Sequence, residues 1–289
     1  MHNKNFESII FNSTKVKVYI YGNTLELTTA LGPRFQIIRK IDKYTYFNIR
    51  TSECKKFKIK ATSRNDNLDV VKRTMKKLRR LITHNFNGGK NQLWITLTFS
   101  EEVTDDEIAS KHYKQFMKKL RRRYSNLEYI SVIEPQESGR WHFHILLKDS
   151  SGSKLYISNE EIEHVWGKGF TKTKRLKTTD KIGNYVTTYL TDLKIDGSEQ
   201  TAKGARLYLY PNGLRIYRRS KNIEDPIEFT DLKENILQSY HIHNKKPDFS
   251  KETVYETKNG VQKYFTEFYD DIKKEATPSK ASDFSQKNN

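Results

Sequence analysis

The sequence contains almost no cysteine and no long apolar run. Cys54 is the single cysteine among 289 residues, which excludes an internal disulfide and a cysteine-rich zinc site and is typical of a reducing compartment. No stretch approaches the roughly 18 apolar residues that a membrane span needs. The start, MHNKNFESII, lacks the apolar segment of a signal peptide. We therefore expect a cytoplasmic protein with no membrane partner.

A nucleotide-binding loop is also missing. The pattern G-x-x-x-x-G-K-[ST] does not occur, and FNGGKNQ at 86–92 has neither its spacing nor its hydroxyl group. The chain is therefore not expected to contain a motor that uses a nucleotide triphosphate.

Positive charge is abundant, with 53 Lys and Arg residues against 35 Asp and Glu, giving a net charge of +18. Such an excess favours a polyphosphate partner, above all nucleic acid, although a solvated basic surface without a ligand is the alternative. Two basic segments, KKLRRRY and FTKTKRLK, contain the candidate nucleic-acid contacts. These are Lys118, Lys119, Arg121, Arg122 and Arg123 in the first, and Lys172, Lys174 and Arg175 in the second.

The hydrophobic pattern indicates an α+β protein. Residues 15–60 alternate apolar and polar groups in short runs and predict antiparallel strands, whereas Leu68 to Leu81 follow a helical stripe. Further along, the pattern predicts a strand at 93–99, a helix capped by Thr104, strands at 129–135 and 140–148, a helix from Ser158, and a hairpin at 205–219. This order suits a central antiparallel sheet with flanking helices and a β-rich N-terminal region.

Two histidines lie on one face of a predicted strand in GRWHFHILL. Because side chains alternate along a strand, His142 and His144 project together while Trp141 and Phe143 project from the other face. Glu134 ends the preceding strand, from which its carboxylate can reach the same face. Two imidazoles and one carboxylate suit a catalytic divalent cation with open positions, Mg²⁺ or Mn²⁺. The alternative is a pair of core histidines bonded to backbone or carboxylate groups.

A predicted helix at 178–194 carries two tyrosines. Tyr185 and Tyr189 are four residues apart, so their phenols share one face and are candidate nucleophiles for a phosphodiester. A phenol has an ordinary pKa of about 10, so a neighbouring base, a lysine or a nearby cation must help it to ionise. Tyrosines at helical spacing can equally be core residues.

The ordered segments LWITLTF, GRWHFHILL and YVTTY resemble the three motifs of HUH endonucleases, specifically rolling-circle replication initiators of small phages and plasmids. The resemblance covers roughly residues 90–220. It implies an RRM-like, palm-like core, a divalent cation on His142, His144 and Glu134, and nucleophilic Tyr185 and Tyr189. The implied activity nicks single-stranded origin DNA, leaving a 5′-phosphotyrosine and a free 3′-hydroxyl, in the cytoplasm of a bacterial host whose helicase and polymerase complete the work.

The tyrosine motif departs from the family pattern. Lysines are often found at the positions that Thr188 and Asp192 occupy here, and Lys181 and Lys194 are the nearby substitutes. Lys194 is therefore a candidate catalytic residue. The alternatives are a relaxase or transposase of the same class, a non-catalytic module that binds single-stranded DNA or RNA, and a metal hydrolase that uses water.

The expected domain organisation follows from these segments. A β-rich region with a basic helix at 1–90 is a candidate for DNA recognition, and 91–222 is the HUH nicking and joining domain. A C-terminal extension is expected at 223–272 and a flexible polar tail at 273–289.

Overall fold

The computed structural model describes residues 7–29, 38–42, 44–56, 68–177, 206–211, 213–257 and 260–272. It divides the chain into two compact units, Met1–Lys60 with Pro226–Asn289, and Ala61–Asp225. Each unit has its own hydrophobic core. The predicted boundaries at 90 and 222 differ from this division. Helix α1 (Leu68–Asn85) contributes its apolar stripe to the core of the second unit, and the strands after Pro226 pair with N-terminal strands. The tail at 273–289 lies outside the described residues.

The second unit is built on an antiparallel five-stranded sheet in the order β10-β7-β8-β6-β9. Its strands are β6 (Gln92–Thr98), β7 (Leu127–Pro135), β8 (Trp141–Asp149), β9 (Thr171–Arg175) and β10 (Tyr217–Arg219). Strands β7 and β8 form the predicted hairpin, in which Leu127 pairs with Asp149 and Pro135 with Trp141. The predicted antiparallel sheet is thereby confirmed.

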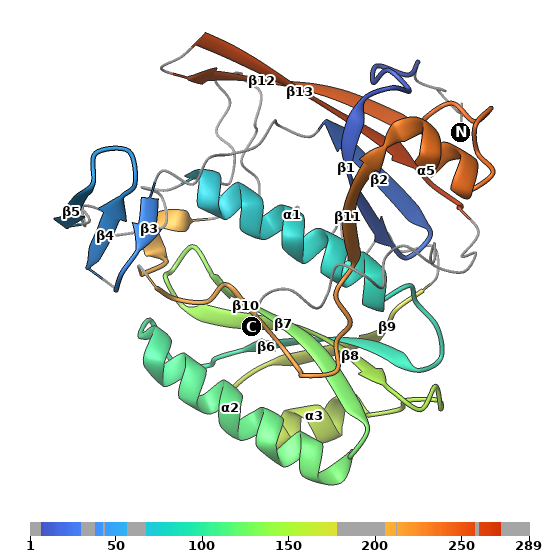
Figure 1. Ribbon diagram of the computed structural model, residues 1–289. Coiled ribbons are helices and arrows are strands. Elements are labelled where there is room, and N and C mark those ends of the chain that lie inside the picture. Colours follow the sequence, from blue (N-terminus) through green and yellow to red (C-terminus); the bar gives the residue numbers. More distant parts are fainter. Residues whose placement is uncertain are drawn as a thin grey trace. The chain divides into compact units, whose positions relative to one another are not determined.

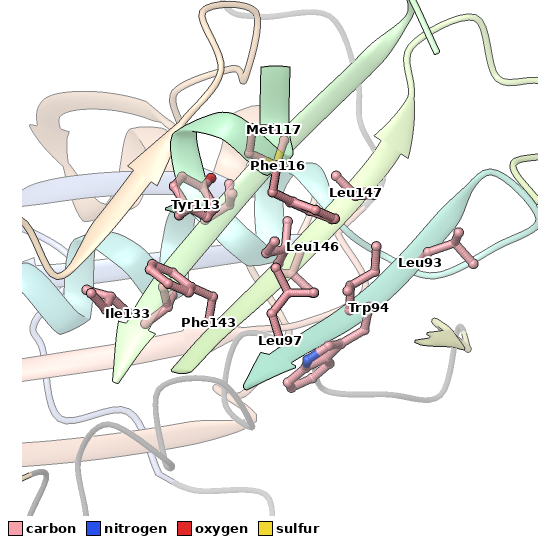
Figure 2. Close-up of a cluster of buried hydrophobic side chains, with 14 of the residues drawn as sticks. Leu93, Trp94, Leu97, Tyr113, Phe116, Met117, Ile133, Phe143, Leu146 and Leu147 are labelled. Atoms are coloured by element: carbon pink, nitrogen blue, oxygen red, sulfur yellow. The ribbon is translucent and has the colours of Figure 1, made fainter. Parts of the chain in front are cut away.

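Helices cover both faces of this sheet. Helix α1 lies on one face, whereas α2 (Asp106–Arg123) and α3 (Asn159–Trp166) lie on the other (Figure 1). On the α2 side, the ring of Tyr113 stacks on Phe143 of β8 with 4.7 Å between centroids, and Figure 2 shows Phe116 and Met117 packed beside them. On the α1 side, Lys148 of β8 donates to the side-chain oxygen of Asn85 at 3.1 Å. The α+β prediction is confirmed.

The helix starts test the predicted caps. Ser158 caps α3 as predicted and accepts a hydrogen bond from the Glu161 backbone N–H. The predicted cap at Thr104 is wrong by one residue, because Asp105 is the N-cap of α2 and accepts from the N–H groups of Glu107 and Ile108. A carboxylate there also interacts favourably with the positive end of the helix dipole.

The predicted hairpin at 205–219 is not seen in its described part. Leu207–Leu209 form a 3₁₀ turn, and the strand β10 begins only at Tyr217. The alternating aromatics have another cause, since Tyr210 is buried against Trp141 with 5.4 Å between ring centroids.

The first unit contains an antiparallel sheet in the order β11-β1-β2-β13-β12 and a three-stranded sheet β3-β4-β5. The strands are β1 (Lys15–Tyr21), β2 (Thr24–Thr29), β3 (Ile38–Lys40), β4 (Thr45–Asn48), β5 (Glu53–Lys56), β11 (Ile227–Leu232), β12 (Phe249–Thr257) and β13 (Gly260–Tyr269), with one helix among the described residues of this unit, α5 (Lys233–Ser239). A buried ion pair, Lys233 Nζ to Glu267 Oε2 at 2.6 Å, joins α5 to β13.

Within the described residues of both units, no helix combines the length and apolar character required to cross a membrane.

Candidate functional site

Glu134, His142 and His144 lie together on one face of the second unit's sheet. The register of the β7–β8 hairpin pairs Glu134 directly with His142, and cross-strand partners project from the same face. Trp141 and Phe143 are buried on the opposite face, in the core beneath α2. The predicted alternation of this strand is confirmed, and it brings the three predicted metal ligands together.

The side chains of this triad converge on one point. Glu134 Oε2 lies 3.2 Å from Nε2 of His142 and 3.3 Å from Nε2 of His144. The two Nε2 atoms are 3.0 Å apart. All three potential ligand atoms are within 4.8 Å of one another. Only 9 to 15% of each side chain is exposed, so the atoms are shielded but reachable from the sheet face.

The electrostatics of the triad suit a cation. Burial by itself raises the pKa of Glu134, but the adjacent His142 and His144 rings outweigh it and lower that pKa to about 2. Burial also lowers the pKa of His144, which keeps its imidazole neutral, the form that binds metals. Glu134 Oε2 and His142 Nδ1 are buried and form no hydrogen bond of favourable geometry within the described residues. Because buried polar atoms rarely stay unsatisfied, these residues fit a bound divalent cation.

Strand β6 supplies neighbours of His144 that sequence reasoning did not identify. Thr96 pairs with His144, and its Oγ1 lies 3.3 Å from Nδ1, while Trp94 Nε1 donates to the same atom at 3.4 Å. These two contacts require different tautomers, because an indole N–H needs a bare Nδ1 and a free Nε2 needs a protonated one. Cation binding through Nε2 would therefore favour donation from Nδ1 to Thr96. The alternation of Trp94 and Thr96 along β6 is the sequence signal for this contact.

The predicted basic residues of β9 fall on both faces of the sheet. Lys172 pairs with Thr96 and Lys174 with Trp94, which places both lysines on the triad face. Lys174 Nζ lies 4.7 Å from the centre of the Trp94 ring. Arg175 lies on the other face, where its guanidinium donates to the carbonyl oxygens of Lys90 and Leu155.

The predicted basic residues of α2 lie on the helix that covers the opposite face. Lys118, Lys119, Arg121 and Arg122 are exposed, and Arg123 bonds Glu161 at 3.1 Å. Lys118, Arg121 and Arg122 line a shallow depression of about 460 Å³ together with Lys114. The sheet therefore separates this group of cations from the triad.

The predicted catalytic residues Tyr185, Tyr189 and Lys194 lie outside the described residues. Another tyrosine does lie beside the triad strand, since Tyr210 donates its hydroxyl to the Ile133 carbonyl at 2.9 Å. Burial and the charge of Glu134 raise its pKa well above the ordinary value, so this phenol stays protonated and is not accessible to a substrate. The sequence offered no signal for this contact, because the segment was interpreted as a strand.

Comparison with known proteins assigns the same part of the chain to a family. Residues 92–194 match the sequence profile of the replication-associated protein ORF2 family. The Phasyl DNA replicon protein arp of Escherichia coli is 30% identical over 159 residues, which are 47% of this chain and 55% of that protein. The chain thus spans about half the length of this relative. No solved structure matches the chain significantly. The chain therefore carries a domain of the replication-associated protein ORF2 family, in agreement with its predicted resemblance to the replication initiators of phages and plasmids.

Proposed function

We propose that this protein initiates rolling-circle replication by nicking and rejoining single-stranded origin DNA through a covalent tyrosine intermediate. The observation that carries the proposal is the convergence of Glu134 Oε2 and the Nε2 atoms of His142 and His144 on one face of the sheet. The family match, which begins at β6 and extends past both candidate tyrosines, supports a replication role for the same segment.

The triad and the tyrosines have separate tasks in this proposal. A divalent cation, Mg²⁺ or Mn²⁺, held by Glu134, His142 and His144 would withdraw charge from the scissile phosphate. The phenol of Tyr185 or Tyr189 loses its proton, with Lys194 as the candidate group that favours ionisation. The phenolate oxygen then bonds to phosphorus while the bond from phosphorus to the 3′ oxygen breaks, and that oxygen takes up a proton.

The products explain how one protein can both open and close a strand. The 5′-phosphotyrosine retains the energy of the broken phosphodiester, so attack by a hydroxyl on the phosphotyrosine rejoins DNA without a nucleotide triphosphate. The free 3′-hydroxyl can prime synthesis. Strand opening and synthesis are assigned to a host helicase and polymerase, because the sequence has no G-x-x-x-x-G-K-[ST] loop.

The test is formation of a covalent protein–DNA adduct. The protein is incubated with Mn²⁺ and labelled single-stranded DNA that carries its replication origin, and the products are separated on a denaturing gel. We expect a labelled band at the protein's mass that depends on Mn²⁺. Replacing both Tyr185→Phe and Tyr189→Phe should abolish the band, since no phenol remains to attack, and the two single variants identify the attacking residue.

The controls separate this activity from its rivals. Tyr156→Phe removes the hydroxyl of another exposed tyrosine and should leave the adduct unchanged. Cleavage without an adduct would indicate a hydrolase that uses water. Binding without cleavage would indicate a non-catalytic module, and an adduct that persists in the double variant would contradict the assignment of the nucleophile.

A further inference from the structure

Phe170 is an exposed aromatic residue beside the triad. It immediately precedes β9, and 65% of the residue is exposed. Thr98 donates to the Phe170 carbonyl from both its backbone N–H at 2.9 Å and its side-chain hydroxyl at 3.0 Å. Since Thr171 pairs with Leu97, the same register sets Phe170 opposite Thr98, and Thr98 in turn pairs with His142. Phe170 is thus two strands from His142, at the same end of the sheet.

The face on which Phe170 lies follows from strand alternation. Lys172 and Lys174 project to the triad face opposite Thr96 and Trp94, and Thr171 between Phe170 and Lys172 is buried. Continuing the alternation by one step places Phe170 on the triad face as well. Exposed Lys168 precedes it by two residues. Lysines and an aromatic ring therefore alternate along the edge strand next to the candidate metal centre.

The backbone at Phe170 is held firmly. Gly169 has φ +148° and approaches the neighbouring strand so closely that a Cβ atom would lie 2.4 Å from the Ser100 nitrogen and 2.6 Å from the Thr98 oxygen. Together with the two hydrogen bonds from Thr98, this close packing fixes the position from which the ring projects. A ring on a pre-ordered backbone loses little entropy when a ligand packs on it.

We propose that Phe170 is a stacking platform for an unpaired base of single-stranded DNA, with the Lys172 ammonium group contacting an adjacent backbone phosphate. Successive bases stack on aromatic rings irrespective of their sequence, and cations beside the ring neutralise the phosphates that accompany them. The platform is on the triad face, so a strand held there leads toward Glu134, His142 and His144. This inference rests on the proposed function for its choice of ligand and identifies how the strand is positioned.

The experiment measures binding without cleavage. Fluorescence anisotropy follows the full-length protein binding a fluorescein-labelled single-stranded oligonucleotide of mixed sequence, in EDTA. Phe170→Ala should weaken binding by roughly 5- to 150-fold, the range for one lost base–aromatic stack. Phe170→Tyr should bind as wild type does. Phe170→Leu, which keeps an apolar side chain without a π face, should be weakened much as Phe170→Ala is.

The matched control is Tyr156→Ala. Tyr156 is 70% exposed, but its neighbour Leu155 bonds Lys90 at the opposite end of β6. Its loss should leave single-strand binding unchanged. For the duplex form of the oligonucleotide, whose bases are paired, Phe170→Ala should bind as wild type does. Lys172→Gln should reduce the slope of log affinity against log salt by about 0.7, the value for one lost single-strand phosphate contact.

The outcomes separate this inference from the proposed function. Phe170→Ala or Phe170→Leu binding as tightly as wild type would overturn the stacking role, whatever the covalent assay gives. Weaker binding of Phe170→Ala by a protein that forms no tyrosine adduct would support stacking and count against nicking. Thermal unfolding of each variant identifies a fold defect, and a loss of binding that appears equally in the duplex assay would also overturn the proposal.

Discussion

At the scale of single residues, the candidate metal centre depends on the protonation of His144. Its Nδ1 is within reach of both Thr96 Oγ1 and Trp94 Nε1, and only the contact in which Nδ1 donates to Thr96 leaves Nε2 free for a cation. The hydroxyl of Thr98, two residues further along β6, is bonded to the Phe170 carbonyl instead. The two threonines therefore offer a matched comparison on one strand.

We predict that Thr96→Val lowers the affinity for Mn²⁺ by about 10- to 100-fold, the usual effect of removing the hydrogen-bond partner of a metal-binding histidine. Isothermal titration calorimetry with Mn²⁺ measures this directly. His144→Ala, which removes a ligand, should lower the affinity at least as much.

Thr98→Val is the control for this prediction and should bind Mn²⁺ as wild type does. Equal affinity in Thr96→Val and wild type would show that the hydroxyl of Thr96 does not hold His144. Equal affinity in His144→Ala and wild type would mean that the triad is not the ion site.

At the scale of secondary-structure elements, the connection from α3 to β9 holds the edge of the sheet in place. Gly167 ends α3 in the left-handed conformation, and Gly169 then packs against the backbone of Thr98 to Ser100. The indole of Trp166 donates to the Thr98 carbonyl at 2.7 Å, which ties the same helix end to β6. The position of β9 therefore depends on the absence of a side chain at residue 169.

We predict that Gly169→Ala destabilises the protein by about 2 to 6 kcal/mol, through backbone strain at positive φ and overlap with the β6 backbone. Chemical denaturation gives the free energy of unfolding. The comparison is Gly152→Ala, because Gly152 also has positive φ (+78°) but has no atom within 4 Å of an added Cβ.

Gly152→Ala should cost only about 1 kcal/mol from strain. A Gly169→Ala variant no less stable than Gly152→Ala would contradict the proposed close packing of β9 on β6.

At the scale of the whole molecule, the net charge of +18 makes binding to DNA sensitive to salt. The sheet of the second unit separates two groups of cations, Lys172 and Lys174 on the triad face and the exposed cations of α2 on the helix across the sheet. One surface is placed to hold the strand that reacts. The other is too far from the triad face to contact the same phosphates, and suits flanking duplex DNA.

We predict that replacing Lys118, Arg121 and Arg122 together by Gln reduces the slope of log affinity for duplex DNA against log salt by about 2 to 3, because each lost phosphate contact contributes about 0.9. Anisotropy titrations over a range of salt concentrations measure this slope.

Replacing the exposed Lys90, Lys154 and Lys221 by Gln removes the same charge from the same unit and should change the slope far less. If both triple variants had the same slope, the effect would come from net charge and not from a binding surface on α2.

The sequence by itself determined the strand and helix pattern of the second unit and the triad. Alternation is a local property of an extended chain, so His142 and His144 had to share a face, and the QESG turn set Glu134 opposite His142. The stripe of α1 and the cap at Ser158 were legible for the same reason, because helix periodicity and capping involve near neighbours in the chain.

Only the tertiary structure decided what depends on contacts between distant segments. It paired β1 with β11, whose residues are about 210 positions apart in the chain, and so divided the chain differently from the predicted boundaries. It assigned the basic residues of α2 and β9 to different sides of one sheet, and it brought Thr96 to His144 and Phe170 to the strand next to the triad. Such contacts follow from the packing of whole elements, and a local pattern contains no information about which elements pack together.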